Sequence, residues 1–381
     1  MEAGSARECS SPARRLRYTA GMRTRFAATR LALCAAALLV TSLPGVADDG
    51  GIPRTASGKP DLTGVYDIAT LTPLERDPKF GDNLYLTPEE AEEIANAVAT
   101  RRADALEASD PTREAPPPGG DGSPGAAGNV GGYNDFWLDY GSGSISIDGK
   151  FRTSLVYDPQ NGRLPKMLPA ALEARMAFFA LFRENTGTAW WLENDGPGPY
   201  DDMEQRPLGE RCILGFGSTS GPPMLPTAYN NLKRVVQTED YVMILAEMIH
   251  DARIIRIGGG HLPEGMTAYM GDSIGRWEGD TLVVETANFG KKPGMYTYGV
   301  GESLKVTERF SRIDANTLNY NFTVEDPNTW ESAWSGEFPW PAADGRVYEY
   351  ACHEGNYALG NIMRGARLLE ADAAAAAGGA E

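Results

Sequence analysis

Histidine is scarce in this chain, and each of its three copies lies in a polar cluster of the C-terminal half. His250 is followed at once by Asp251, His261 comes after three glycines, and His353 precedes Glu354. An imidazole changes its charge near neutral pH, so one of these residues can serve as a general acid or base. Three histidines could also ligate one metal ion that keeps an open position. A structural, hydrogen-bonded histidine is the alternative for each of them.

The segment around His353 is the first choice for acid/base chemistry. A general acid or base needs a fixed position, and a disulfide through the preceding Cys352 would anchor this segment. We therefore predict His353, Glu354 and His250 as catalytic residues. His261 is the weakest candidate, because three preceding glycines predict a mobile loop that cannot preorganise a ligand.

Residues 241–250 are expected to form the strand that carries His250. Side chains alternate between the two faces of a strand, so His250 and Asp251 are expected to point in opposite directions. Asp251 and Arg253 are two residues apart on one face, which makes them the better candidates for an ion pair.

A carboxylate in the middle of an apolar strand face is a second unusual feature. Glu308 shares its face with Leu304, Val306 and Phe310. Such a carboxylate either has an arginine partner or has a raised pKa. We predict Glu308 and Arg253 as substrate-binding residues. The alternative, favoured by how rarely a carboxylate is buried without a partner, is an ion pair of Glu308 with a neighbouring arginine. The candidate partners are Arg253, Arg276 and Arg309.

Aromatic side chains are the other resource for ligand binding. In a barrel they could line a cavity for an apolar or aromatic ligand, or stack on sugars. Core packing is the expected role of most of them. Trp190 and Trp191 lie beside a loop-like Asn-Asp-Gly-Pro stretch, where burial is less obligatory. We predict these two residues, together with Tyr348 and Tyr350, as substrate contacts.

Several motifs that mark common enzyme classes are absent from the sequence. It has no Gly-x-Ser-x-Gly elbow, Walker loop, dinucleotide fingerprint, His-Glu-x-x-His or paired Cys-x-x-Cys. Hydride transfer, nucleotide hydrolysis and zincin chemistry are therefore disfavoured. We expect no cofactor and no resident metal.

The charge balance limits the possible partners. The 381 residues include 35 Lys and Arg against 52 Asp and Glu, a net charge of −17. This acidity argues against binding to nucleic acid or to an anionic membrane surface. A small-molecule ligand or substrate is the expected partner.

Residues 1–47 have the pattern of a cleaved signal peptide, with Met22 as an alternative start. Arginines precede a short apolar run at residues 31–40, and a small-x-small cleavage site ends at Ala47. The protein is therefore expected in the periplasm or outside the cell. Cys9 and Cys34 leave with the signal peptide, and the two remaining thiols, Cys212 and Cys352, are expected to form a disulfide in an oxidising compartment.

The mature chain divides into three segments. Residues 48–108 contain a first strand near 65–68 and a helix from Thr87, whose Thr-Pro-Glu-Glu start is a capping box. Residues 109–132 are rich in Pro and Gly and are expected to form a flexible loop. Residues 133–381 form a β-rich domain with a helix at 168–183 and a flexible Ala/Gly-rich C-terminal tail.

The β-rich domain is predicted to be a mainly antiparallel meander. Short turns such as Glu278-Gly279-Asp280 join most of the expected strands, the last of which covers residues 347–353. About eight such strands must curl or close to protect their edges. We expect a lipocalin-like β-barrel or a strongly bent sheet, with two peripheral helices.

Three sequence blocks together resemble a large group of uncharacterised exported bacterial proteins. Residues 54–66 read Arg-Thr-Ala-Ser-Gly-Lys-Pro-Asp-Leu-Thr-Gly-Val-Tyr, with Tyr66 where Trp is usual in the group. Residues 275–289 contain Trp-Glu-Gly-Asp-Thr-Leu-Val-Val-Glu-Thr, and residues 348–357 contain Tyr-Ala-Cys-His-Glu-Gly-Asn. The resemblance covers nearly the whole mature chain and implies no activity and no catalytic residue.

The leading functional hypothesis is an exported enzyme, a lyase or isomerase, that uses acid/base chemistry on an apolar or aromatic small molecule in a barrel cavity. The first alternative is a lipocalin-like protein that binds such a molecule without changing it. The second is a metal-dependent hydrolase that uses the three histidines.

Overall fold

The computed structural model describes residues 51–108, 112, 114–115, 117, 137–180, 186–215, 217–263, 265–290, 301 and 303–378. The predicted signal peptide and most of the predicted loop at 109–132 lie outside these residues. Among the described residues, no helix is both long enough and apolar enough to cross a lipid bilayer.

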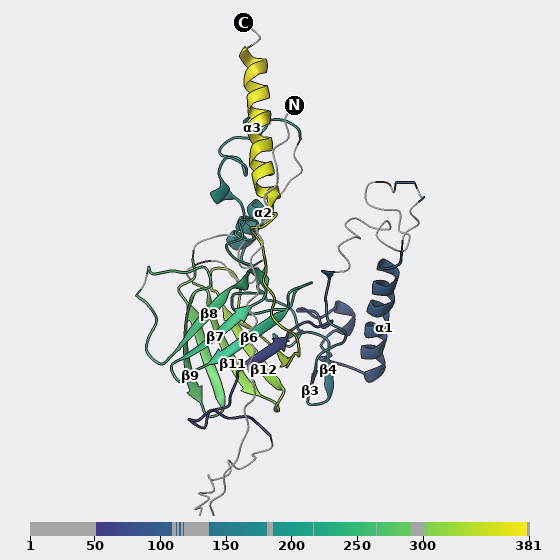
Figure 1. Ribbon diagram of the computed structural model, residues 1–381, viewed down its shortest axis with the longest axis vertical. Helices are drawn as coiled ribbons and strands as arrows, with labels where there is room; N and C mark the ends of the chain where they lie inside the picture. Colours follow the sequence, from purple (N-terminus) through teal and green to yellow (C-terminus); the bar gives the residue numbers. More distant parts are fainter. Residues whose placement is uncertain are drawn as a thin grey trace, which may run out of the picture. The chain divides into compact units, whose positions relative to one another are not determined.

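A strongly curled sheet of ten strands dominates the fold, as predicted (Figure 1). The strand order is β1-β6-β7-β8-β9-β10-β11-β12-β13-β5. The sheet curls far enough for β1 to meet the end of β13, where Tyr66 bridges to Ala342 and the Ala343 N–H donates to the Val65 carbonyl over 2.8 Å. The strands are β1 Gly64–Asp67, β5 Val156–Asp158, β6 Leu232–Gln237, β7 Tyr241–Ala246, β8 Ala252–Ile257, β9 Asp272–Glu278, β10 Thr281–Ala287, β11 Lys305–Arg312, β12 Thr317–Glu325 and β13 Trp334–Pro341.

One strand pair departs from the antiparallel pattern expected from the sequence. β8 and β9 are parallel, with Ile255 opposite Ser273, so residues 258–271 must carry the chain back along the sheet. The turn predicted between β9 and β10 is confirmed: Glu278 pairs with Thr281, and Gly279 has a φ of 62°, which a glycine adopts without steric cost.

The inner face of the curled sheet is filled by large side chains. Along β12 the buried positions alternate with less buried ones, and Tyr320 lies among Phe310, Phe338 and Trp340 with ring centroids 4.8–5.4 Å away. These rings are almost completely buried. Core packing, the role expected of most aromatics, is therefore confirmed for this group.

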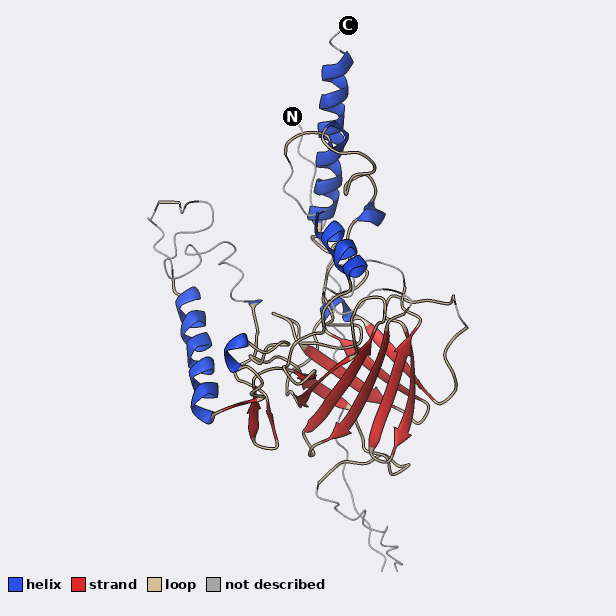
Figure 2. Cartoon of the chain, turned by 180° about the vertical axis from the view of Figure 1, so that it is seen from behind, coloured by secondary structure: helices blue, strands red, loops and turns tan. Residues whose placement is uncertain are grey.

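Smaller elements surround the sheet (Figure 2). A second sheet has the order β2-β4-β3, with β2 Tyr85–Leu86, β3 Ser146–Ile147 and β4 Lys150–Arg152. Helix α1 spans Pro88–Ala105, and its predicted capping box is present: the Glu90 N–H donates to Thr87 Oγ1, and the Thr87 N–H donates to Glu90 Oε2. Short 3-10 helices are η1 Pro78–Phe80, η3 Trp190–Leu192, η4 Met203–Gln205 and η5 Met248–His250.

The C-terminal part corrects two predictions. Residues 347–353 form no strand, and the tail that we expected to be flexible forms helix α3, Tyr357–Gly378. Alanine, leucine and arginine are strong helix formers. Summed over this stretch, their favourable helix propensities outweigh the unfavourable propensities of its glycines. The chain thus has three α-helices among its described residues instead of two. The second of them, α2, spans Pro169–Ala180, within the predicted helix at 168–183.

Candidate functional site

The segment predicted to be catalytic lies outside the curled sheet. Cys212 and Cys352 form the predicted disulfide, with Cα atoms 5.8 Å apart. The side chain of Asn356 donates to the Glu210 carbonyl, so this segment is also held next to Cys212 by a hydrogen bond. His353 and Glu354 are nevertheless exposed, because the turn that carries them faces away from the core.

His250 does not lie on a strand, which corrects its predicted position. β7 ends at Ala246, and Ile249 and His250 then adopt positive φ values in η5. This tight reversal, closed by the Ala246 N–H donating to the Asp251 carbonyl, turns the imidazole outward. His250 Nδ1 lies 3.2 Å from the Tyr350 carbonyl oxygen, so the fold brings together two segments that the sequence analysis singled out.

The predicted ion pair between Asp251 and Arg253 is not formed. The Asp251 carboxylate accepts the Gly215 N–H over 3.3 Å, and burial raises the pKa of Asp251. Arg253 points into the sheet and pairs with Glu308, with Nη1–Oε2 and Nη2–Oε1 distances of 2.7 and 3.0 Å. The sequence pattern misled here because β8 starts at Ala252, so Asp251 precedes the strand.

Glu308 is therefore part of the core through the ion pair that the sequence analysis left open. Its Oε1 also accepts the Tyr320 hydroxyl over 2.7 Å, and that hydroxyl accepts the Met224 N–H. Burial and the charge of Glu308 raise the pKa of Tyr320 well above its usual value. Since both carboxylate oxygens are occupied, we assign Glu308 and Arg253 to the interior of the sheet instead of to a ligand site.

The aromatic residues predicted to contact substrate lie apart from one another. Trp190 packs closely on Gly198, where a Cβ would come within 2.6 Å of the indole. Trp191 is exposed, and Tyr348 is 72% exposed. Tyr350 is partly buried, and burial raises its pKa. Their roles in substrate binding stay predictions.

His261 is held far more firmly than we expected. Its Nδ1 lies 3.0 Å from Asp272 Oδ2, and its Nε2 lies 3.4 Å from Glu285 Oε1. The Leu262 N–H donates to Asp272 over 2.8 Å and fixes the loop backbone. These contacts form because the parallel pairing of β8 and β9 places this loop over two strand carboxylates; that the loop is mobile stays a prediction. A long connection between parallel strands is the signal that could have revealed it.

The three histidines occupy three separate places, at η5, in the connection from β8 to β9, and after β13. Within the described part of the chain, no cluster of His, Cys, Asp and Glu side chains is arranged to hold a metal ion.

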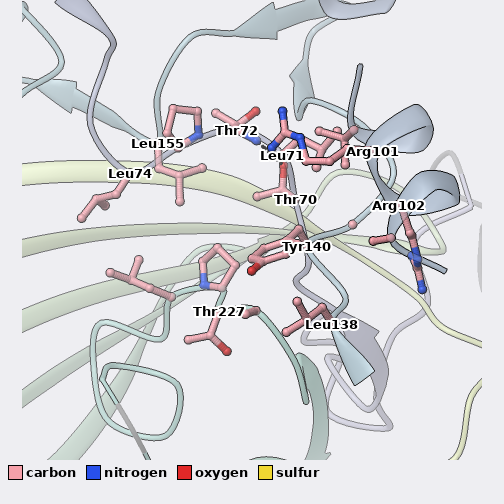
Figure 3. A pocket seen from close by; sticks show the side chains of 17 residues that line it. Thr70, Leu71, Thr72, Leu74, Arg101, Arg102, Leu138, Tyr140, Leu155 and Thr227 are labelled. Atoms are coloured by element: carbon pink, nitrogen blue, oxygen red, sulfur yellow. Dashed lines mark hydrogen bonds between the residues drawn. The ribbon is translucent and has the colours of Figure 1, made fainter. Parts of the chain in front are cut away.

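A pocket of about 590 Å³ lies between α1 and the loops beside β1 (Figure 3). Five chain segments line it, and most of the side chains are apolar. They are residues 70–74, Val98, Arg101, Arg102 and Ala105 of α1, residues 138 and 140–141, Leu155, and residues 225–228. Its volume is in the range of small-molecule binding sites.

The threonines of this pocket anchor its walls. The Thr70 hydroxyl donates to the Gly143 carbonyl, Thr72 Oγ1 accepts the Ile145 N–H, and the Thr227 hydroxyl donates to the Tyr229 carbonyl. Leu155 and Leu225 belong to the hydrophobic core, so the floor of the pocket is continuous with the packed interior. The pocket walls are therefore largely preformed.

The threonine side chains are bonded to the backbone, so the charged groups left to contact a ligand are the two arginines on the α1 side of the pocket. Figure 3 shows Arg101 extending from α1 toward Leu71 and Thr72, with Tyr140 on the other wall. Neither Arg101 nor Arg102 has a carboxylate partner within salt-bridge distance among the described residues. An apolar cavity with two uncompensated guanidinium groups is suited to a ligand that has an apolar body and a negative end.

Neither a scan against protein-family models nor a search of curated proteins gives a match to this chain. The resemblance to exported bacterial proteins therefore stays a prediction, and the function is argued from the geometry of the pocket.

Proposed function

We propose that this protein binds a small organic anion with an apolar or aromatic body in the pocket between α1 and the loops beside β1. The observation that carries the proposal is the combination of a largely apolar cavity of about 590 Å³ with Arg101 and Arg102 on its α1 wall. The proposal keeps the first alternative stated above, a protein that binds a small molecule without changing it. The binding site, however, lies beside the curled sheet instead of in its interior.

The apolar part of the cavity supports an apolar ligand body. Leu138, Leu155 and Leu225 line the pocket together with the ring of Tyr140. Burying apolar ligand surface against such side chains contributes about 25 cal/mol per Å². A planar aromatic body would in addition stack on the Tyr140 ring.

The guanidinium groups support a carboxylate, sulfonate or similar anionic group at one end. The chain as a whole carries a net charge of −17, so an anion is attracted only where basic groups are locally concentrated. A charge-assisted hydrogen bond from an arginine contributes about 1.5–3 kcal/mol.

Binding without chemical change fits this pocket better than acid/base catalysis. None of the three predicted catalytic residues lines it; they are His250, His353 and Glu354. Among the described residues that line the pocket, Tyr140 is the only one, apart from the two arginines, whose side chain can titrate. An acid/base enzyme needs a titratable group within hydrogen-bond reach of the reacting atom.

The proposal is tested with two fluorescent compounds that share one aromatic body. Anilinonaphthalene sulfonate carries a negative charge, and N-phenylnaphthylamine is its uncharged analogue. We expect saturable binding of both to the folded full chain, with the sulfonate bound about tenfold more tightly. Both compounds should be recovered unchanged. Equal affinities, or fluorescence that rises without saturation, would contradict the proposal.

A further inference from the structure

The outer face of the curled sheet is largely apolar on three neighbouring strands, β6, β7 and β8, which Figure 1 shows side by side. Side chains alternate along each of these strands, so the residues between the buried ones point away from the core. Among these outward side chains only Arg234 and Arg256 are charged. The others form what we call the outer patch: Leu232, Val236, Tyr241, Met243, Leu245, Ala252 and Ile254.

The outer patch is continuous from strand to strand. Val236 lies opposite Met243, and Met243 lies opposite Ile254, so these three side chains form one row across the sheet. Tyr241 and Leu245 lie on either side of Met243 along β7. Ile254 is 48% exposed and Tyr241 is 51% exposed. A contiguous exposed apolar surface of this kind is typical of a contact site on a soluble protein.

The outward positions are polar on strands farther along the sheet. On β11 they include Lys305, Thr307 and Arg309, which alternate with buried residues. On β12, Thr323 lies opposite Thr307, and Asn321 lies opposite Arg309. An apolar surface is therefore not a general property of the outer face of this sheet.

Charges of opposite sign lie at the two ends of the outer patch. Glu239 and Asp240 lie in the exposed turn that joins β6 to β7. Arg234 is exposed near the other end, opposite Leu245. None of these three charged groups forms a salt bridge with another residue that the structure describes. They can therefore pair with charges on a second molecule.

We propose that the outer patch is the contact surface between two copies of this chain, related by a two-fold axis. In such a contact both copies use the same surface. If the axis runs across the strands, β6 of one copy lies antiparallel over β6 of the other. The acidic turn of each copy then lies over the partner's Arg234, while the apolar rows pack together as in sheets stacked about 10 Å apart.

The charges favour a second copy over an unrelated protein, because the acidic and basic ends of the outer patch complement each other when the patch is turned end to end. The three strands have six residues each. They span roughly 20 by 14 Å, which is small beside the roughly 800 Å² per partner of a standard interface. We therefore expect a reversible dimer with a dissociation constant in the micromolar range. The inference is independent of the proposed ligand, because no residue of the outer patch lines the pocket.

The test is analytical ultracentrifugation of the folded full chain over a concentration series from about 1 to about 100 µM. We expect monomers at the low end and dimers at the high end. Ile254→Glu places a carboxylate in the apolar row and should raise the dissociation constant of the dimer at least about tenfold. The matched control is Ile313→Glu, which should dimerise normally, because Ile313 is also 48% exposed but lies outside the outer patch.

Two outcomes of this experiment would overturn the inference. One is a chain that stays monomeric at about 100 µM, which would leave the outer patch to a partner of another kind. The other is a dimer that Ile254→Glu does not weaken, which would place the contact on a different surface. The concentration series of the unaltered chain needs no variant, so the inference stays testable even if Ile254→Glu does not fold.

Charge reversal tests the two-fold arrangement itself. Arg234→Glu places a carboxylate over the partner's acidic turn and should weaken the dimer about fivefold. Adding Glu239→Arg to this variant should restore the affinity, because opposite charges then face each other again. Circular dichroism checks that the variants are folded. A combined variant that dimerises no better than Arg234→Glu alone would contradict the arrangement.

Discussion

Arg253 donates two hydrogen bonds to Glu308 through the interior of the sheet, although β9 and β10 lie between their strands in the sheet order. Their side chains are 2% and 0% exposed. The two groups can meet only because the sheet curls and brings β8 to face β11. The ion pair is therefore direct evidence that the sheet is curved, because these two strands could not face each other in a flat sheet.

Removing one partner of this pair should strongly destabilise the protein. Glu308→Gln leaves the Arg253 guanidinium buried without its counter-charge, and we expect a loss of about 3–5 kcal/mol in the free energy of unfolding. Urea denaturation measures it. The matched control is the exposed pair of Arg309 and Glu278, where Glu278→Gln should change the free energy of unfolding far less, because water screens the two charges. Similar losses in both variants would show that the interior pair is not buried as described.

Lys233 should make stability rise with pH in the alkaline range. The pKa of Lys233 is lowered by burial from 10.5 to about 8, so between these values the unfolded chain binds more protons than the folded one. Stability then increases as pH rises through this window. Relative to Lys233→Met, the unaltered chain should gain on the order of 3 kcal/mol from pH 8 to 10.5. A pH-independent difference between the two proteins would contradict this prediction.

Asp272 should support stability at all but strongly acidic pH. Burial opposes ionisation of Asp272, but the hydrogen bonds from Arg256, the Leu262 N–H and His261 outweigh it and lower the pKa to about 2, against an ordinary value of 3.8. The contribution is complete above about pH 4 and is lost as pH falls through 2. Asp272→Asn should therefore be less stable than the unaltered chain near pH 6, with a difference that shrinks in acid. Asp280→Asn, at an exposed carboxylate, is the control and should show little change.

The disulfide between Cys212 and Cys352 should contribute strongly to stability, since the two residues are separated by 140 positions. Closing a long loop restricts the unfolded chain, and replacing both cysteines by alanine should cost about 2–5 kcal/mol. Peptide mapping without reduction should recover the two cysteines in one linked fragment. Labelling of both by a thiol reagent in the unreduced protein would refute the pairing.

Local patterns in the sequence were sufficient for much of the fold. The capping box at Thr87 depends on residues three positions apart, and the turn at Gly279 depends on one backbone conformation, so both could be recognised directly. The alternation of Val306, Glu308 and Phe310 likewise identified one face of β11, and all three are buried. Such features need no knowledge of distant parts of the chain.

Features that depend on distant segments could not be recognised in this way. His261 gains its partners only because β8 and β9 pair in parallel. His250 turns outward because Ile249 and His250 have positive φ values, which neither residue type predicts. The pocket is assembled from five separate segments, and α1 contributes Arg101 and Arg102 from a surface that by itself looks like an ordinary solvated helix face. The segments come together only in the folded chain, so no local pattern identified the pocket.

The most direct test of the central claim compares the unaltered chain with Arg101→Gln/Arg102→Gln, using the same two fluorescent compounds. We expect the double variant to bind anilinonaphthalene sulfonate at least about tenfold more weakly, because the charge-assisted contacts are lost. Its affinity for N-phenylnaphthylamine should not change. The control is Arg234→Gln, on the exposed face of β6, which should bind both compounds normally. A double variant that still binds the sulfonate like the unaltered chain would contradict the proposed anion site.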